Sequence, residues 1–379
     1  MSQDVIGVDP ARRPRPFGLR RRAGAALVVL ALAGAGVYLA GRSNPPARPA
    51  PPAAGQAERP TVPSQQVIVD LAVGTTSAYA LIGRCLVTPP GPCSQQLLTS
   101  TGDGTWRTTV PDLPAPAGND GGFSARLVVG DDRPTLVEDD LGLVFPVEGS
   151  GYGRLPLTDS GAVDKIPPGT VVEAPDGTVR LLDPAAGWRY RLANQPPVGT
   201  VRAVARNEET LVAVGERGSA VVGAVSHGGQ RWAAETIRGL RPGPLLLRLA
   251  AGRDGGAYLL VGRETYPEVK DEFTELWRYD GRWRNVTPRV RPRSASSLVI
   301  GRDGRPLLTE ETGGVWRLQP DGTLLRMPDA YLEGLRVKPG YLVTGPSGLL
   351  LSQGVDPFDR TALLSSNDGA NTWSVFLPV

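Results

Sequence analysis

Histidine and cysteine are almost missing from this sequence, whose 379 residues include one His and two Cys. A structural zinc site usually takes four Cys or His ligands, so this composition argues against a zinc-binding fold. Aromatic residues are also sparse, at 6%. Gly and Pro are abundant instead, with 48 and 37 residues, which is typical of short strands joined by tight turns. We expect an all-β protein without a metal ion or a cofactor.

A large excess of charge is also absent from most of the chain. The formal charge is +3, but residues 1–22 carry a net +4, residues 42–63 a net +2, and residues 23–41 none. Residues 64–379 are therefore mildly acidic, at −3. A nucleic-acid-binding domain would present excess Lys and Arg to the phosphates. The basic isoelectric point reflects the N-terminal segments, and we expect no nucleic-acid partner.

One long run without charge stands out, at residues 23–41. As a helix it would extend about 28 Å at ~1.5 Å per residue, which is enough to cross a bilayer core. Three arginines, Arg20–Arg22, precede it. The positive-inside rule therefore predicts a transmembrane signal anchor, with residues 1–22 as a cytoplasmic basic tail and the rest of the chain outside a bacterial cell membrane. A cleaved signal peptide is the alternative, because small residues late in the run resemble cleavage sites.

Residues 42–63 contain seven prolines among Ala, Arg and Gly. Proline fixes φ and removes an amide donor, so this composition favours an extended, polyproline-like segment over a packed structure. We interpret residues 42–63 as a stalk that holds the following domain, residues 64–379, away from the membrane.

Residues 64–379 repeat one pattern of apolar strands and Gly-rich turns. The segment from Leu298 to Glu310 is nearly repeated from Leu127 to Glu138. Each copy predicts four antiparallel strands, A to D, with a turn before strand D that a Trp often follows. These turns recur about every 44 residues, at Asp103-Gly104, Gly149, Ala186-Gly187, Gly228-Gly229, Asp280-Gly281, Asp321-Gly322 and Asp368-Gly369.

Repeats of this period stack radially, because a single four-stranded sheet cannot bury both of its faces. We therefore predict a seven-bladed β-propeller of four-stranded antiparallel blades over residues 64–379, preceded by one transmembrane helix. The blade between Ser160 and Leu192 has the shortest strands, which leaves six or eight blades as alternatives. On this register strand A begins the first blade and strand D ends the last, so no strand crosses over to close the ring.

The last turn, residues 366–373, reads Ser-Asn-Asp-Gly-Ala-Asn-Thr-Trp. It matches the Asp-box, Ser-x-Asp-x-Gly-x-Thr-Trp, except for Ala370 where the motif prefers Gly, and weaker echoes occur at residues 100–106 and 226–232. The turn resembles the repeats of the sialidase-like (BNR, Asp-box) propellers. In that family the Asp and Ser bond the turn backbone and the Trp packs between sheets. The structural residues implied by this resemblance are Ser366, Asp368, Gly369, Thr372 and Trp373.

The catalytic set of the sialidases is not recognisable in this sequence. Arg154-Leu155-Pro156 is the nearest match to their Arg-Ile-Pro motif, but it lies in a predicted strand D, whereas the family places the motif on an inner strand near the start. The resemblance therefore implies a non-catalytic, membrane-anchored bacterial member, and we assign no catalytic residue.

Three connections between strands B and C are longer than the others, at Cys85–Cys93, Glu264–Glu275 and Gly354–Arg360. B–C loops share one face of a propeller, where binding sites usually lie, so we expect an acidic rim with aromatic contacts. The candidate binding residues are Glu264, Tyr266, Glu268, Asp271, Glu272, Phe273, Asp356, Phe358 and Asp359. Cys85 and Cys93 enclose a Pro-rich loop outside the cytoplasm, and we expect a disulfide between them.

The sequence thus predicts a membrane-tethered, extracytoplasmic propeller that binds a protein or a cell-envelope glycan and does no chemistry. The alternative is a glycoside hydrolase, sialidase-like, that acts at the cell envelope and uses two facing carboxylates. A third possibility is an assembly factor like the Asp-box propellers of photosynthetic membranes, which share the blade count.

Overall fold

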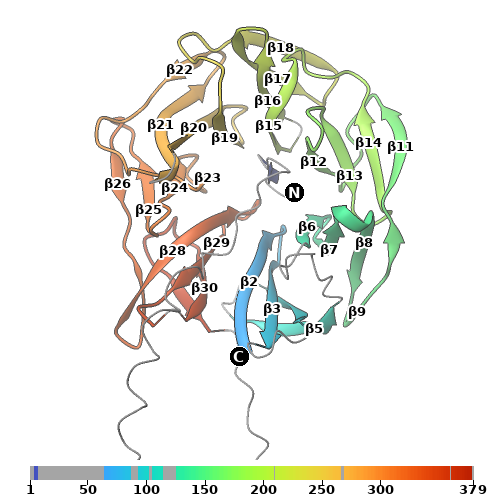
Figure 1. Ribbon diagram of the computed structural model, residues 1–379, viewed down its shortest axis with the longest axis vertical. Helices are drawn as coiled ribbons and strands as arrows, with labels where there is room; N and C mark the ends of the chain where they lie inside the picture. The colour runs from blue at the N-terminus through green and yellow to red at the C-terminus, as the bar shows by residue number, and fades with distance from the viewer. Residues whose placement is uncertain are drawn as a thin grey trace, which may run out of the picture.

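The computed structural model describes residues 4–6, 64–86, 93–101, 105–113, 125–208, 210–265, 269–358 and 360–377. Their strands form seven sheets arranged around a common centre (Figure 1), so the prediction of a seven-bladed all-β propeller is confirmed. The expected membrane helix at residues 23–41 and the stalk at residues 42–63 lie outside these residues. Within the described ranges, no helix has the length and apolar character needed to cross a bilayer.

Six blades begin at their inner strand and follow the expected antiparallel order. Blade 1 consists of β2 (Ser64–Val73), β3 (Ala78–Leu86), β4 (Cys93–Ser100) and β5 (Arg107–Leu113). Blade 2 consists of β6 (Arg126–Gly130), β7 (Arg133–Glu138), the short helix η1 (Asp139–Leu141), β8 (Leu143–Glu148) and a fourth strand in two pieces, β9 (Gly151–Tyr152) and β10 (Leu155–Pro156). Blade 4 consists of β15 (Thr200–Asn207), β16 (Thr210–Arg217), β17 (Ala220–His227) and β18 (Arg231–Thr236), and β1 (Asp4–Ile6) pairs with β15.

The remaining regular blades complete the ring on the left of Figure 1. Blade 5 consists of β19 (Leu245–Ala251), β20 (Ala257–Thr265), β21 (Val269–Tyr279) and β22 (Trp283–Asn285). Blade 6 consists of β23 (Ser297–Ile300), β24 (Pro306–Thr309), β25 (Val315–Leu318) and β26 (Leu324–Arg326). Blade 7 consists of β28 (Leu335–Thr344), β29 (Leu350–Val355), β30 (Thr361–Ser366) and β31 (Ser374–Phe376), with β27 (Ala330–Leu332) paired to the start of β28.

Blade 3 departs from the antiparallel prediction. Its sheet runs β12 (Val171–Glu173), β13 (Arg180–Asp183), β14 (Trp188–Leu192) and, outermost, β11 (Thr158–Val163), which is parallel to β14. The strand that precedes β12 in sequence, β11, thus lies on the outer edge of the sheet. In the other blades this place in the sequence is taken by the inner strand. The reason is composition: β11 is polar and almost wholly exposed, whereas the inner strands of other blades are rich in buried Val, Leu and Ala.

The direction of β12 shows which strand is missing from blade 3. Val201, at the start of β15, donates its amide to Gly177 O, just after β12. Near the end of β15, Arg206 Nη1 donates to Thr170 O, just before β12, over 2.8 Å. These contacts show that β12 is antiparallel to β15, the inner strand of blade 4. Because strands A and B of a blade run in opposite directions, β12 takes position B, and β13 and β14 take positions C and D. The turn at residues 184–187 therefore precedes strand D, as predicted.

The ring closes where blade 1 meets blade 7. One core cluster joins Ile68, Leu71 and Val73 of β2 with Leu351 and Leu363 of blade 7. No strand of the described chain pairs across this junction. Closure by face-to-face packing of the first and last blades is thus confirmed.

The tryptophans after the turns before strand D pack mainly onto the preceding blade. Trp106 lies 6.5 Å from the Phe376 ring of blade 7, and Trp232 Nε1 donates to Asn194 O, after blade 3, over 2.8 Å. Trp283 lies against Gly223 of blade 4. Trp188 in blade 3 differs, because it is 48% exposed.

Candidate binding face

One face of the ring carries the B–C hairpins, and we call it the B–C face. The inner strand of blade 1 also begins on this face, because Ser64 at the start of β2 is the register partner of Leu86 at the end of β3. The three elaborated connections are the β3–β4, β20–β21 and β29–β30 hairpins, each between the second and third strands of its blade. The antiparallel order puts all three on the B–C face, as predicted, with blades 1 and 7 as neighbours in the ring.

In blade 1 the two cysteines are direct partners across the hairpin. Cys85 and Cys93 face each other in the register of β3 and β4. Residues 87–92 and both cysteine side chains lie outside the described part of the chain, so the disulfide between them stays a prediction.

In blade 5 the predicted loop is largely strand. β20 continues to Thr265 and β21 starts at Val269, which is the register partner of Thr265, so the two strands pair along most of the predicted loop. The side chains of Glu264, Tyr266, Glu268 and Asp271 lie outside the described residues.

Two of the predicted binding residues in this hairpin have described side chains, and neither is exposed. Phe273 was predicted as a rim contact, but only 2% of it is exposed and it packs in a core cluster with Tyr258 and Leu276. The alternation of β21 turns Phe273 toward blade 6, which explains the error. Glu272, one residue before, is partly buried.

A basic segment that the sequence reasoning missed runs beside this hairpin. It follows β22, and Phe273 N donates to Arg293 O over 3.0 Å. Arg291 stacks over the Phe273 ring at 5.7 Å, and its Nε donates to Phe273 O over 3.3 Å. The alternating arginines at residues 289, 291 and 293 were the available signal. The blade 5 side of the B–C face is therefore mixed in charge and not simply acidic.

In blade 7 the connection at residues 356–360 is a structured turn built on Asp356. The Asp356 carboxylate accepts bonds from the amides of Phe358 and Arg360, both at 2.9 Å, and from Arg360 Nε at 2.6 Å. Burial would raise the pKa of Asp356, but these donors lower it overall. Since Asp356 is 4% exposed, it shapes the turn and does not face a ligand, contrary to prediction.

The same turn presents an aromatic ring to solvent. Phe358 is 69% exposed, and the Arg360 guanidinium lies 5.9 Å from its centre. Asp359 lies outside the described residues. Among the described binding candidates, Phe358 is thus the residue that is free to contact a partner.

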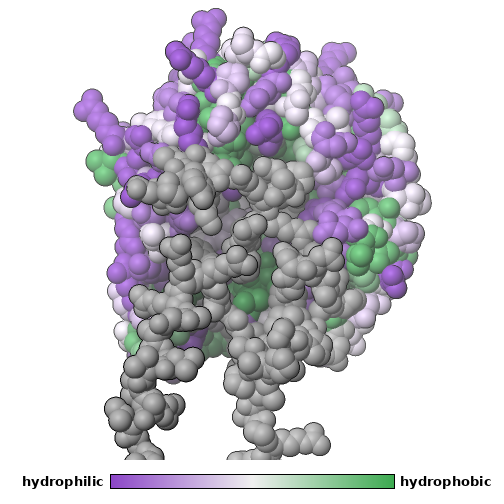
Figure 2. Space-filling model, viewed as in Figure 1, coloured by the Kyte–Doolittle hydropathy of each residue, from purple (hydrophilic) through white to green (hydrophobic). Residues whose placement is uncertain are grey.

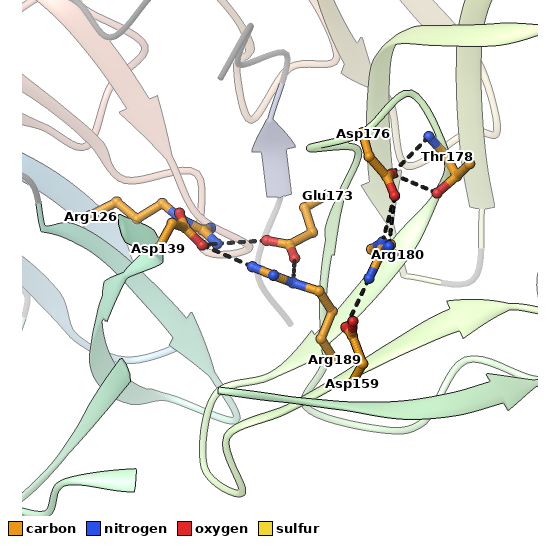
Figure 3. A network of polar contacts seen from close by, with 8 residues as sticks. All are labelled: Arg126, Asp139, Asp159, Glu173, Asp176, Thr178, Arg180 and Arg189. Carbon is orange, nitrogen blue, oxygen red and sulfur yellow. Dashed lines mark hydrogen bonds and ion pairs between the residues drawn. The ribbon is translucent and has the colours of Figure 1, made fainter. Parts of the chain in front are cut away.

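A charge cluster lies where blades 2 and 3 meet (Figure 3). Arg126 Nη2 bonds Glu173 Oε2 at 2.6 Å, and Arg126 Nε bonds Asp139 Oδ2 at 2.8 Å. Arg189 bonds the other oxygens, Glu173 Oε1 at 2.5 Å and Asp139 Oδ1 at 2.8 Å. Two arginines and two carboxylates therefore alternate in a closed ring of zero net charge, which we call the junction cluster.

The electrostatics of the junction cluster do not suit acid–base catalysis. Burial would raise the pKa of Asp139, but Arg126 and Arg189 lower it overall. Burial would lower the pKa of Arg126, but Glu173 and Asp139 raise it. A glycoside hydrolase needs one carboxyl group that stays protonated near neutral pH. Asp139 is thus favoured in its ionised form, and each carboxylate of the cluster is occupied by two arginines.

A second polar group lies on the inner strands of blades 1, 5 and 7. Asp70 Oδ1 and Oδ2 accept the amides of Leu71 and Leu127 at 2.8 and 2.7 Å. Burial and then Asp70 raise the pKa of Tyr341 to about 12, while Arg248 opposes the shift. A tyrosine nucleophile would need an adjacent base that draws off its proton. Tyr341 is instead held protonated at neutral pH.

The last turn has the hydrogen bonds that its sequence predicts. Asp368 Oδ1 accepts the amides of Asn371 and Thr372 at 3.0 and 2.9 Å, and Oδ2 accepts the Thr372 hydroxyl at 2.6 Å. Ser366 Oγ donates to Asp368 Oδ1 over 2.9 Å, and Gly369 has a φ of 72°. These contacts are internal to the hairpin, so the turn is a structural element and not a binding site.

Trp373 packs as predicted, although it is only partly buried. It lies against core clusters of blades 6 and 7, and its Nε1 donates to Pro328 O over 3.2 Å. In the described part of the chain, no three His, Cys, Asp or Glu side chains are grouped so as to hold a metal ion.

No protein-family model and no curated protein matches the chain. Among solved structures it is similar to a catalytically inactive virginiamycin B lyase from Staphylococcus aureus bound to quinupristin, with 12% identity over 79% of this chain and 98% of the other and a TM-score of 0.48. It is also similar to the acylaminoacyl peptidase of Pyrococcus horikoshii, with 9% identity over 82% and 51% and a TM-score of 0.48. A third similarity is to YCF48 bound to D1 peptide, with 14% identity over 83% and 85% and a TM-score of 0.31. Likenesses this distant carry no inference about activity.

Proposed function

We propose that this protein is a membrane-tethered, extracytoplasmic propeller that binds a protein or an envelope glycan through its B–C face and does no chemistry. The observation that carries the proposal is the gathering of three elaborated hairpins on one face, with Phe358 69% exposed at the tip of one of them. A large exposed aromatic ring beside a cation is a typical anchor for a partner.

The state of the charged groups supports binding over hydrolysis. Asp139 and Glu173 are each bridged by two arginines, Asp356 is committed to its own turn, and the pKa of Tyr341 is raised. A catalytic pair would need carboxyl groups with separated pKa values facing a common space.

Capture by the purified protein tests the proposal. Immobilised protein is exposed to envelope extract and to a panel of envelope glycans, and bound material is compared with that of Phe358→Ala. The matched control is Leu325→Ala, which removes a 49% exposed side chain from β26 of blade 6. We expect Phe358→Ala to weaken capture about tenfold or more, as loss of a hot-spot aromatic does, and the control to leave it unchanged.

Two results would contradict the proposal. One is turnover of fluorogenic glycosides by the wild type that Glu173→Gln or Tyr341→Phe abolishes, which would make the protein a glycoside hydrolase. The other is equal capture by Phe358→Ala and Leu325→Ala, which would remove the B–C face from binding.

A further inference from the structure

The centre of the ring holds a strand that comes from outside the repeats. β1 pairs antiparallel with β15, the inner strand of blade 4, and Figure 1 shows it near the middle of the ring, beside the label N. β16 pairs with the other edge of β15, so β1 occupies the edge that faces the centre, which we call the channel edge of β15. The register partners are Asp4 with Arg206, Val5 with Ala205 and Ile6 with Val204.

The irregular blade 3 leaves room for a strand at this place. Its inner position is empty, because its innermost strand, β12, takes position B and has three residues. β1 lies close to β12 and to β19, the inner strand of blade 5. By contrast, β2, β6, β19 and β23 each end their sheets and pair with no further strand of the described chain. Strand addition at β15 is therefore a local feature of the side of the ring where blade 3 is incomplete.

The register shows which residues suit the channel edge of β15. A strand that adds to an open edge is held by its backbone amides and carbonyls, while its side chains decide which sequence fits. Val5 and Ile6 are β-branched, which favours extended backbone, and their partners in β15 are fully buried. Asp4 lies opposite Arg206, and opposite charges on facing strands attract. The edge thus suits a short extended segment with an acid followed by β-branched apolar residues.

The arginine at the end of this site is held in place by the backbone. Arg206 Nη1 donates to Thr170 O and its Nε donates to Glu208 O, both over 2.8 Å. These two acceptors are neutral carbonyls, so they position the guanidinium without neutralising its charge. A positioned cation favours an acidic residue at the facing place of the added strand.

We propose that the channel edge of β15 is a docking site for an extended segment of a partner protein, and that β1 is an internal competitor that shows how such a segment binds. The partner segment adds as an antiparallel strand along residues 204–206. This site goes beyond the proposed function, because it is separate from the B–C hairpins and does not involve Phe358. If residues 23–41 span a membrane as predicted, residues 4–6 lie across it from β15, and the edge is open to the partner without competition.

Peptide binding to the purified full chain tests the proposal. The probe is a labelled peptide with the sequence of residues 2–8, and the target carries Val5→Pro and Ile6→Pro. Neighbouring amides of a strand point to opposite edges, so these prolines remove the donor that faces β15 whichever of the two it is. We expect the peptide to bind this variant and to bind the wild type about tenfold more weakly, because a competing segment on the same chain has a millimolar effective concentration. The peptide N-methylated at both positions should not bind.

A disulfide cross-link locates the bound peptide. A peptide with Val5→Cys is added to the proline variant that also carries Ala205→Cys. Facing residues of antiparallel strands have Cα atoms about 4.5–5.5 Å apart, which a disulfide can span. The matched control is Ala72→Cys in β2, an inner strand that ends its sheet. We expect cross-linked product at Ala205→Cys and none above background at Ala72→Cys.

Three results would overturn the proposal. The first is equal cross-linking at the two cysteine positions, and the second is equal binding of the N-methylated peptide. The third is a full chain with Val5→Cys and Ala205→Cys that cross-links into dimers, which would assign the edge to a second copy. Failure here with intact Phe358-dependent capture would leave the proposed function standing, whereas loss of that capture alone would refute only the proposed function.

Discussion

Blade 3 and blade 7 hold their outer strands in the ring by different means. In blade 7 the last hairpin is closed by the Asp368 carboxylate, and Trp373 packs onto the segment before the blade. In blade 3 the corresponding turn has Asp183 bonding the amides of Ala185 and Ala186, but Trp188 is 48% exposed. Charges anchor blade 3 instead, through the junction cluster to blade 2. A repeat that loses an inner strand and a packed Trp can therefore be kept in register by an ion network around the buried Glu173.

The largest effect is expected from opening the junction cluster. Glu173→Ala leaves two mostly buried guanidinium groups with one shared carboxylate, and breaking a buried ion network in this way costs about 3–5 kcal/mol of the free energy of unfolding. Urea unfolding of the purified propeller, residues 64–379, measures it. Asp159→Ala is the control, since that carboxylate is 69% exposed and its pair with Arg180 is worth no more than about 1 kcal/mol. A loss no larger than that of the control would mean that the cluster does not hold blade 3.

The turn of blade 3 gives a second test, because its glycine is packed against blade 2. Gly187 has a φ of 69°, and a Cβ added there would lie 2.6 Å from Pro156 O. Gly187→Ala should cost about 2–4 kcal/mol through overpacking and backbone strain together. Gly322, in the blade 6 turn, has a φ of 81°, and no atom lies within 4 Å of a Cβ added there. Gly322→Ala should therefore cost about 1–2 kcal/mol of the free energy of unfolding. Equal losses would show that blades 2 and 3 do not press together at this turn.

The turn of blade 7 should respond locally. Asp368→Ala removes the acceptor of two amides and of the Thr372 hydroxyl, which we expect to cost about 1–2 kcal/mol because the turn is at the surface. Thermal melting measures the loss, and capture by the B–C face should be unaffected. A ligand-binding defect in this variant would contradict its structural role.

Acid should weaken the ring modestly through its ion-paired carboxylates. Burial would raise the pKa of Asp176, but Arg180 and Thr178 lower it to about 2, and the pKa of Asp139 is lowered too. A carboxyl group whose pKa is lower in the folded state than its unfolded value near 3.8 stabilises the fold at pH values above that unfolded pKa. This stabilisation is lost as the pH falls through the folded-state pKa. The melting temperature should therefore fall between about pH 4 and about pH 2, and less steeply in Asp176→Asn. An unchanged slope in that variant would remove Asp176 from this dependence.

The sequence was sufficient for the ring and for its turns. The seven recurring turns predict the blade count, and the residue types of the Asp368 turn predict its hydrogen bonds. Both features depend on contacts between residues that are close in sequence. Blade 3 required more than local pattern. The sequence indicates only that this blade has short strands. The place of residues 158–163 outside β14 depends on which strand edge is open, which is a property of the assembled ring.

The binding face was predicted less well, for two physical reasons. Whether Phe273 points to the core or to the rim depends on the register of β21, and a shift of one residue reverses it. The sequence alone suggests that Asp356 faces a ligand. In the folded turn its carboxylate is instead occupied by hydrogen bonds from Arg360. The arginines at residues 289–293 were overlooked because only the fold places them beside the β20–β21 hairpin.

A double-mutant cycle between Arg126 and Glu173 tests most directly the claim that the junction charges hold the ring together. Arg126→Met, Glu173→Gln and the double variant are unfolded in urea beside the wild type. The two side chains are bonded at 2.6 Å. The double variant should therefore lose less of the free energy of unfolding than the sum of the two single losses, with a coupling energy of at least about 1 kcal/mol. Additive losses, within about 0.5 kcal/mol, would contradict the claim and return Glu173 to the list of groups free for chemistry.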